Sequence, residues 1–121
     1  MREIKFRAWD KINKDMFNVE SINFQERRVY KDTVSYRKFE NIDLMQYTGL
    51  KDKHNKKIYE GDILFESFGE RYYKVVFENG GFRTEFEEYF DGYSFDLIDV
   101  VLDLCEIIGN IYENPELIED E

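Results

Sequence analysis

The stretch RYYKVVFENGGFRTEFEEY, at residues 71–89, decides the fold class of this sequence. Alternate large side chains share one face in each half of it, namely Tyr73, Val75 and Phe77, then Phe82, Thr84 and Phe86. Such alternation is typical of a β-strand that buries one face. Asn79-Gly80-Gly81 separates the halves, and Asn-Gly is favoured in tight hairpin turns because both central positions need a positive φ. The segment therefore predicts an antiparallel hairpin.

Further elements are expected on both sides of this hairpin. Alternating apolar residues bounded by turn residues predict strands at 2–9, 16–24, 42–47, 58–64 and 106–112, and a smaller hairpin at 27–37. The most polar segment, 48–57, is predicted as a loop. The apolar residues of 96–105 have helical spacing, which predicts a short helix with a strand as the alternative. Asn114-Pro115 predicts a closing helical turn capped by Asn114.

These elements predict a mainly β (β-rich α+β) fold. We expect a small twisted barrel or packed antiparallel sheets, with one short helix near the C-terminus. The 121 residues suffice for one domain, 1–121, in which residues 1–45 form a possible N-terminal β-hairpin subdomain or assembly arm. The hydrophobic content of 42% argues against disorder.

Charge is divided unevenly along the chain. Residues 1–60 carry 14 Lys/Arg and 10 Asp/Glu, a net charge of +4, whereas residues 61–121 carry 3 and 17, a net charge of −14. The division has two interpretations: solvated faces of one compact domain, or a basic half that meets the acidic half of a second copy head to tail. The net charge of −10 makes general nucleic-acid binding improbable, because phosphate contacts require clustered cations.

The cysteine count and the hydropathy of the chain indicate the cellular compartment. One cysteine, Cys105, allows no intramolecular disulfide, so the chain needs no oxidising compartment. No apolar run is long enough to span a bilayer, and the first residues lack the apolar core of a signal peptide. We therefore predict a cytoplasmic protein without membrane contact.

Few residues are suited to catalysis or metal binding. His54 is the only histidine, which excludes zinc sites with two histidines, and its Lys-rich surroundings favour a solvated side chain. Cys105 is interpreted as a buried small hydrophobic residue. Acidic residues gather at 85–91 and 96–103, and strand or helix spacing predicts that they are solvated. We predict no catalytic residue, no cofactor and no metal ion, and hence no enzyme.

A basic and aromatic stretch opens the chain. Lys5, Arg7 and Trp9 alternate with apolar residues, and exposed aromatics beside cations can bind single-stranded nucleic acid. The alternative, which we favour, is an amphipathic strand whose Trp9 is packed.

Three segments together resemble a known family. MREIKFRAWDKINKDM at 1–16, LMQYTGLKDKHNKKIYEGDIL at 44–64 and EIIGNIYENPEL at 106–117 are similar, in order and spacing, to the YopX family of phage and prophage proteins. The resemblance implies a bacterial host cytoplasm and transfers no catalytic residue. It leaves Asp52, Glu60 and Asp62 either as turn-forming acids or as part of a functional surface.

The sequence thus predicts a non-enzymatic phage or prophage accessory protein. We expect it to act through protein–protein contacts, to self-assemble as a homo-oligomer and to contact a host or phage protein. Its predicted functional surface comprises Asp52, Glu60, Asp62, Trp9, Lys5 and Arg7. The alternative is an acidic nucleic-acid mimic that inhibits a host DNA-binding protein.

Overall fold

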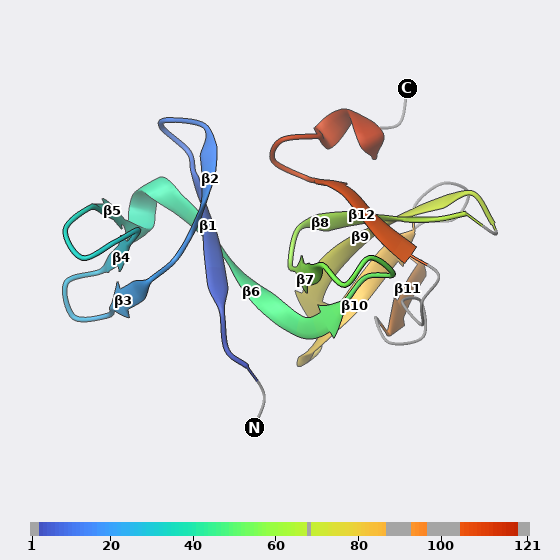
Figure 1. The fold of residues 1–121 in the computed structure, drawn as a ribbon, viewed down its shortest axis with the longest axis horizontal. Helices are drawn as coiled ribbons and strands as arrows, with labels where there is room; N and C mark the ends of the chain where they lie inside the picture. Colours follow the sequence, from blue (N-terminus) through green and yellow to red (C-terminus); the bar gives the residue numbers. More distant parts are fainter. Residues whose placement is uncertain (1–2, 68, 87–92, 97–104, 119–121) are drawn as a thin grey trace. The chain divides into compact units, whose positions relative to one another are not determined.

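The computed structural model describes residues 3–67, 69–86, 93–96 and 105–118 (Figure 1). These residues form antiparallel sheets, one of which curls into a half-barrel, and the predicted mainly β fold is confirmed. The chain divides into two compact units, Met1–Tyr47 and Thr48–Glu121. We call them the N-terminal unit and the C-terminal unit, and strand β6 continues from the first into the second.

The N-terminal unit is built from short strands and one 3₁₀ turn. They are β1 (Phe6–Asp10), β2 (Asp15–Asn18), β3 (Ser21–Asn23), β4 (Arg28–Tyr30), β5 (Tyr36–Lys38), the 3₁₀ turn Phe39–Asn41 and β6 (Ile42–Lys51). One sheet has the order β2-β1-β6-β7, in which β7 is Lys57–Tyr59 of the C-terminal unit, and a second has the order β3-β4-β5. The core of the unit consists of Ala8, Phe17, Val29 and Ile42.

The prediction of one strand at 16–24 is wrong, because the chain changes partner there. The amide of Val19 donates to the carbonyl of Phe6 in β1 (3.0 Å), whereas the next amide, of Glu20, donates to the carbonyl of Tyr30 in β4 (2.8 Å). Residues before this point therefore pair in one sheet and residues after it in the other. The predicted hairpin at 27–37 is confirmed by the pairing of β4 with β5.

The C-terminal unit contains six further strands. They are β7 (Lys57–Tyr59), β8 (Asp62–Glu66), β9 (Arg71–Glu78), β10 (Gly81–Phe86), β11 (Tyr93–Asp96) and β12 (Cys105–Asn110). All of these except β7 form one sheet, in the order β11-β10-β9-β8-β12. The core consists of Ile58, Leu64, Tyr73, Val75 and Cys105, so each unit has its own hydrophobic core.

The central hairpin forms as its sequence predicts. Gly81 pairs with Glu78, which leaves Asn79 and Gly80 as the two-residue turn, with φ of 53° and 80°. The predicted loop at 48–57 is shorter than expected, because β6 extends to Lys51 and pairs with β7. The hydrogen bonds of a continued strand outweigh the polar character of these residues.

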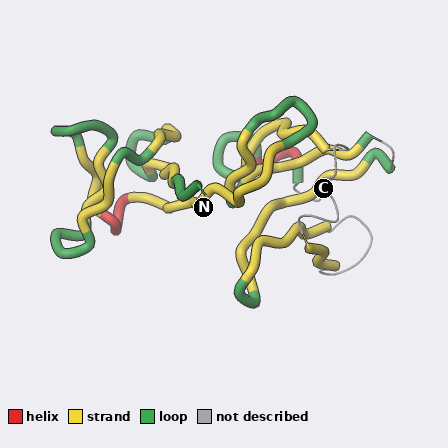
Figure 2. The backbone as a smooth tube through the Cα atoms, turned by 60° about the horizontal axis from the view of Figure 1, so that its bottom comes forward, coloured by secondary structure: helices red, strands yellow, loops and turns green. Residues whose placement is uncertain are grey.

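Two predictions concern helical structure near the C-terminus. Of the helix predicted at 96–105, residues 97–104 lie outside the described residues, and Asp96 and Cys105 at its ends lie in strands. The closing turn is confirmed as a 3₁₀ turn, Pro115–Leu117, one of two drawn red in Figure 2. None of the described helices is long and apolar enough to cross a membrane.

Asn114 does not cap the closing turn by its side chain. Its Oδ1 instead accepts the amide of Asn110 (3.1 Å), at the end of β12. This contact requires a glycine at position 109, since a Cβ there would overlap the Asn114 side chain. The register of β12 against β8 also shifts between Ile107 and Gly109, so this glycine lies at a strand irregularity rather than in a turn.

Candidate functional site

The predicted basic and aromatic residues lie on or beside strand β1. Lys5 is exposed just before the strand, and its carbonyl accepts the amide of Tyr47 (2.8 Å). Arg7 is half-buried, and Trp9 is only 9% exposed. A buried Trp9 cannot stack on a nucleotide base, so the packed-strand interpretation accounts for this stretch.

Asp52 lies between β6 and β7, where its carboxylate organises the backbone. Oδ1 accepts the amides of His54 and Lys56, each at 2.9 Å, and Oδ2 accepts the amide of Ile107 in β12 at 2.9 Å. The residue is 5% exposed. Burial by itself raises the pKa of Asp52, but the three amide hydrogen bonds outweigh it and the net pKa is lowered. Asp52 is therefore a buried carboxylate that fixes a turn.

Asp62 is the first residue of β8, directly after the turn that follows β7. It is 1% exposed, and its Oδ2 accepts the amide of Tyr59 (2.8 Å) across the turn. Gly61 supplies the positive φ of 85° that this turn needs, and its amide donates to the carbonyl of Val75 (2.8 Å). Glu60 is half-buried beside them. The structure thus places Asp52, Glu60 and Asp62 in consecutive turns of the C-terminal unit.

The remaining residues suited to chemistry lie on or near β12. The exposed His54 ring approaches Glu106, with 3.1 Å between Nε2 and Oε2. Cys105 is fully buried, and this burial raises the pKa of its thiol to about 11, so it is a poor nucleophile at neutral pH. Within the described residues, no group of three or more His, Cys, Asp or Glu side chains could hold a metal ion.

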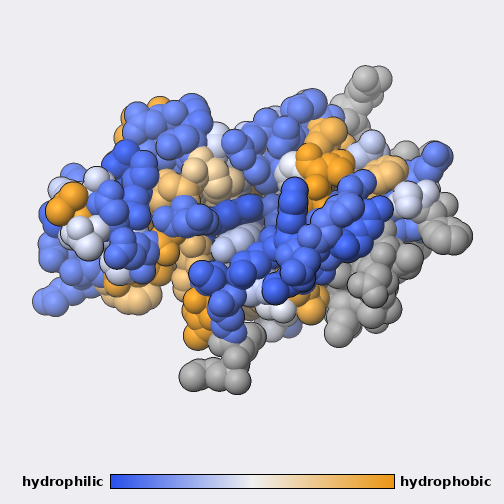
Figure 3. All heavy atoms as spheres, in the orientation of Figure 1, coloured by the Kyte–Doolittle hydropathy of each residue, from blue (hydrophilic) through white to orange (hydrophobic). Residues whose placement is uncertain are grey.

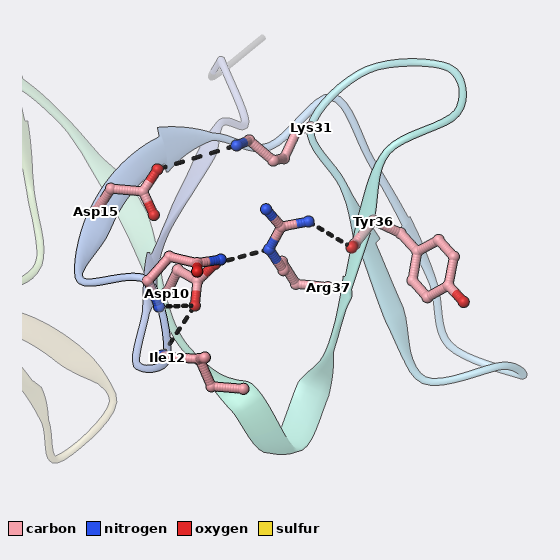
Figure 4. A network of polar contacts seen from close by, with 7 residues as sticks. Asp10, Ile12, Asp15, Lys31, Tyr36 and Arg37 are labelled. Carbon is pink, nitrogen blue, oxygen red and sulfur yellow. Dashed lines mark hydrogen bonds and ion pairs between the residues drawn. The ribbon is translucent and has the colours of Figure 1, made fainter.

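A buried network in the N-terminal unit escaped the sequence analysis. Asp10 is fully buried, and Figure 4 shows Arg37 of β5 directed toward it, with 2.6 Å between Nε and Oδ2. The Asp10 carboxylate also accepts the amides of Ile12 (2.9 Å) and Asn13 (3.0 Å) and the side-chain amide of Asn13 (2.9 Å). Burial raises the pKa of Asp10, but these donors outweigh it and hold the pKa well below its ordinary value.

The three-stranded sheet β3-β4-β5 has two different faces. Its inner face carries Ile22, Val29 and Arg37, which the pairing places side by side. Its outer face carries Ser21, Asn23, Arg28, Tyr30, Tyr36 and Lys38, and we call these six residues the outer face. In Figure 4 the ring of Tyr36 points away from the Asp10–Arg37 pair. The Asp10–Arg37 pair therefore fixes β5 from its inner face, while Tyr36 and Lys38, the neighbours of Arg37, face outward.

Aromatic and cationic side chains contact one another on the outer face. The guanidinium of Arg28 lies 4.1 Å from the ring centre of Tyr36, and the rings of Tyr30 and Tyr36 are 5.7 Å apart. At one edge, Phe24 is 74% exposed. An open hollow of about 600 Å³ borders the face, lined by residues that include Phe24, Tyr30 and Asp32.

Large exposed apolar side chains also occur away from Phe24 and Tyr36. Among the described residues these are Ile4, Ile12, Val34, Leu44, Tyr72 and Phe77. Figure 3 shows the face in view as mainly hydrophilic with separate apolar areas. Single exposed apolar residues are ordinary, so the outer face stands out by combining rings and guanidinium rather than by hydrophobicity alone.

The sequence held a signal for the outer face. Arg28 alternates with Tyr30, and Tyr36 alternates with Lys38, so each pair shares one strand face. Pairing the two strands of the predicted 27–37 hairpin would have brought all four together.

Comparison with known proteins places the chain in a family. The sequence model of the YopX protein family matches residues 5–119. The chain belongs to the YopX family. This membership confirms the resemblance seen in the three sequence segments.

Two solved structures share the fold of this YopX-family chain. One is protein EF1440 from Enterococcus faecalis, with 30% identity, a TM-score of 0.74 and coverage of 98% of this chain and 100% of that chain. The other is protein yopX from Bacillus subtilis, with 22% identity, a TM-score of 0.61 and coverage of 100% and 99%. A search of curated proteins gave no match.

Proposed function

We propose that this YopX-family chain is a non-enzymatic phage or prophage accessory protein that acts in the host cytoplasm through protein–protein contacts and self-assembles. The observation that carries the proposal is the outer face, where Arg28, Tyr30 and Tyr36 form a contiguous group on a sheet whose other face packs on the core through Val29 and Ile22. Tyrosine and arginine are enriched among the residues that dominate binding energy at protein interfaces.

The outer face suits a protein partner with carboxylate groups. Arg28 and Lys38 provide positive charge, and the rings of Tyr30 and Tyr36 provide rigid apolar surface that loses little entropy on binding. Arg28 forms an ion pair with Glu26 at 2.9 Å, in which Arg28 is partly exposed and Glu26 is exposed. Such an exposed pair contributes little energy, so a partner's carboxylate can compete for the guanidinium.

The absence of catalysis is supported by how the ionisable groups are used. Asp10 and Asp52 are buried and accept several hydrogen bonds each, and Asp62 accepts a turn amide. Their carboxylates satisfy backbone groups, and a general acid or base needs a carboxylate that can reach a substrate. The buried thiol of Cys105 has a raised pKa, which disfavours the thiolate.

Self-assembly is supported by the division of charge along the chain. Residues 1–60 carry 14 Lys/Arg and 10 Asp/Glu, a net charge of +4, and residues 61–121 carry 3 and 17, a net charge of −14. Opposite charges on one chain favour a head-to-tail contact between copies over a symmetric contact of like charges.

A double substitution tests the outer face. Arg28→Ala with Tyr36→Ala removes the stacked pair without touching the inner face, and Arg71→Ala with Tyr72→Ala removes the same residue types from β9 as a matched control. A host or phage protein recovered with the wild type is purified, and its affinity is measured by calorimetry. We expect about 30-fold weaker binding for the outer-face variant, as for loss of an interface hot spot, and unchanged binding for the control. Equal affinity of both variants would overturn the proposal.

A further inference from the structure

The connection between β6 and β7 is a concentrated positive region in an acidic unit. We call residues 51–57, KDKHNKK, the basic turn; it contains four of the seven Lys/Arg of the C-terminal unit. Its one acidic residue, Asp52, is buried with its carboxylate engaged by backbone amides. The rest of the unit from residue 61 onward carries a net charge of −14.

Hydrogen bonds hold the basic turn in one conformation. Within it, the amide of Asp52 donates to the carbonyl of Lys56 (2.8 Å), and the amide of Asn55 donates to the carbonyl of Asp52 (2.9 Å). Asn55 adopts the positive φ, 66°, that the reversal requires.

The same turn is attached to the open edge of β12. The amide of Lys53 donates to the carbonyl of Cys105 (3.0 Å), and the Asp52 carboxylate accepts the amide of Ile107. His54 adds its contact with Glu106. The basic turn is thus fixed at both its tip and its base, so ordering its backbone on binding costs little entropy.

The lysines of the basic turn have charge available for a partner. Lys51, Lys53 and Lys56 are exposed, and their ammonium groups have no salt-bridge partner among the residues that the structure describes. Elsewhere in the same unit, Lys74 pairs with Glu85 at 3.2 Å and Arg83 pairs with Glu78 at 3.6 Å. Lys74 and Arg83 are therefore already neutralised locally, whereas the charges of Lys51, Lys53 and Lys56 are available to a partner.

We propose that the basic turn is the cationic side of the self-assembly contact and binds the acidic surface of the C-terminal unit of a second copy. This inference rests on the proposed self-assembly and names its contact. Both the basic turn and the surplus of acidic residues belong to the same unit. Copies can therefore join head to tail through that unit, without a contribution from residues 1–47.

Charge favours an acidic protein surface over nucleic acid as the occupant. The basic turn is seven residues long, whereas the surrounding unit has a net charge of −12. A nucleic-acid strand is longer than the screening distance of about 8–10 Å, so its phosphates would also approach the negative charges of the C-terminal unit. A local acidic patch on a protein can contact the basic turn alone. Each copy also supplies the complementary acidic surface at the same concentration.

Charge reversal tests the contact in the full chain. Lys53→Glu with Lys56→Glu reverses two exposed lysines of the basic turn, and Lys5→Glu with Lys11→Glu makes the same change at two exposed lysines of the N-terminal unit. Sedimentation velocity at low salt measures the assembly. We expect the basic-turn variant to assemble at least about 30-fold more weakly and the control to assemble as the wild type does, since buried contacts are untouched in both.

The outcomes separate this inference from the function on which it rests. A wild type that stays monomeric would overturn the proposed self-assembly itself. If the wild type assembles and the basic-turn variant assembles equally well, only the role of the turn is overturned. The same holds if the basic-turn variant and the N-terminal control variant weaken assembly equally. Binding of a labelled single-stranded oligonucleotide by the wild type, lost in the basic-turn variant, would overturn the choice of a protein occupant.

Discussion

The outer face of the N-terminal unit and the basic turn of the C-terminal unit are each positioned by a buried aspartate, but the two aspartates form different kinds of hydrogen bond. Asp10 reaches another strand through the guanidinium of Arg37, at 2.6 Å. Asp52 reaches another strand through the backbone amide of Ile107, at 2.9 Å. The Asp10 contact joins two side chains and depends on the arginine at position 37. The Asp52 contact joins a side chain to a backbone amide, which almost any residue supplies.

This difference follows from the strands of the two units. The strands of the N-terminal unit before β6 are three to five residues long, so a charged pair adds a connection that few ladder hydrogen bonds provide. The C-terminal unit has the eight-residue strand β9 and a longer ladder. In that unit, the hydrogen bond from the Ile107 amide at the edge of β12 to the Asp52 carboxylate is sufficient to attach the basic turn. The predictions below test this comparison, from the largest expected effect to the smallest.

Asp10→Ala should be the most damaging of these substitutions. It leaves the half-buried guanidinium of Arg37 unpaired and removes the acceptor of two turn amides. We expect a loss of about 3–4 kcal/mol in the free energy of unfolding of the N-terminal unit. Urea titration followed by Trp9 fluorescence reports this unit, because Trp9 is the only tryptophan and lies in β1.

Asp15→Ala is the control, because the Asp15–Lys31 pair is exposed and spans 3.9 Å. It should cost no more than about 0.5 kcal/mol. Equal costs for the two substitutions would show that burial of Asp10 does not matter.

Asp52→Ala should cost somewhat less, about 2–3 kcal/mol, because it leaves amides rather than a charged group without an acceptor. Hydrogen exchange measured by NMR gives the local effect. We expect the amides of His54, Lys56 and Ile107 to lose protection, while amides of β1 in the other unit keep theirs. Unchanged protection of Ile107 would contradict the structural role assigned to Asp52.

Gly109→Ala tests the close approach at the end of β12. The added Cβ overlaps the Asn114 side chain, so we expect a loss of about 1–2 kcal/mol measured by thermal denaturation. Gly81→Ala is the matched control, because a Cβ there meets no atom within 4 Å. A neutral Gly109→Ala would mean that the Asn114 contact is not formed in solution.

Acid should weaken both aspartate contacts. The folded-state pKa values of Asp10 and Asp52 are lowered, so their contributions are present above the unfolded pKa of about 4 and are lost as the pH falls toward the folded pKa. Between pH 5 and pH 3, Asp10 should lose about 1 kcal/mol of unfolding free energy, and the contribution of Asp52 should fall in the same direction. The variant Asp52→Asn, which does not titrate at this position, should show a smaller loss than the wild type. An identical pH dependence would contradict the assignment.

The local sequence was sufficient to predict an element where the residues that determine it are close together in the chain. The central hairpin follows from Asn79-Gly80 and the alternation around it, and the closing turn follows from Pro115. The bonds that position the candidate surfaces join distant residues. Asp10 and Arg37 are 27 residues apart, and Asp52 and Ile107 are 55 apart, so neither pair has a local pattern.

Sequence also misled where pairing overrode local pattern. Residues 16–24 alternate like one strand, but successive amides of Val19 and Glu20 bond to different sheets. The sequence left Asp52 and Asp62 either as turn-forming acids or as part of a functional surface, and the structure buries both against backbone amides, as turn-forming acids would be. The exposed lysines between them, at Lys53 and Lys56, are what remains available to a partner.

Light scattering behind a size-exclusion column, at about 50 mM and about 500 mM salt, tests the central claim of self-assembly through charge most directly. The account predicts a discrete oligomer of the wild type at the lower salt and the 14.8 kDa monomer at the higher. An oligomer that persists unchanged at the higher salt would contradict the electrostatic contact. A monomer at both would contradict self-assembly and favour an acidic mimic that acts alone.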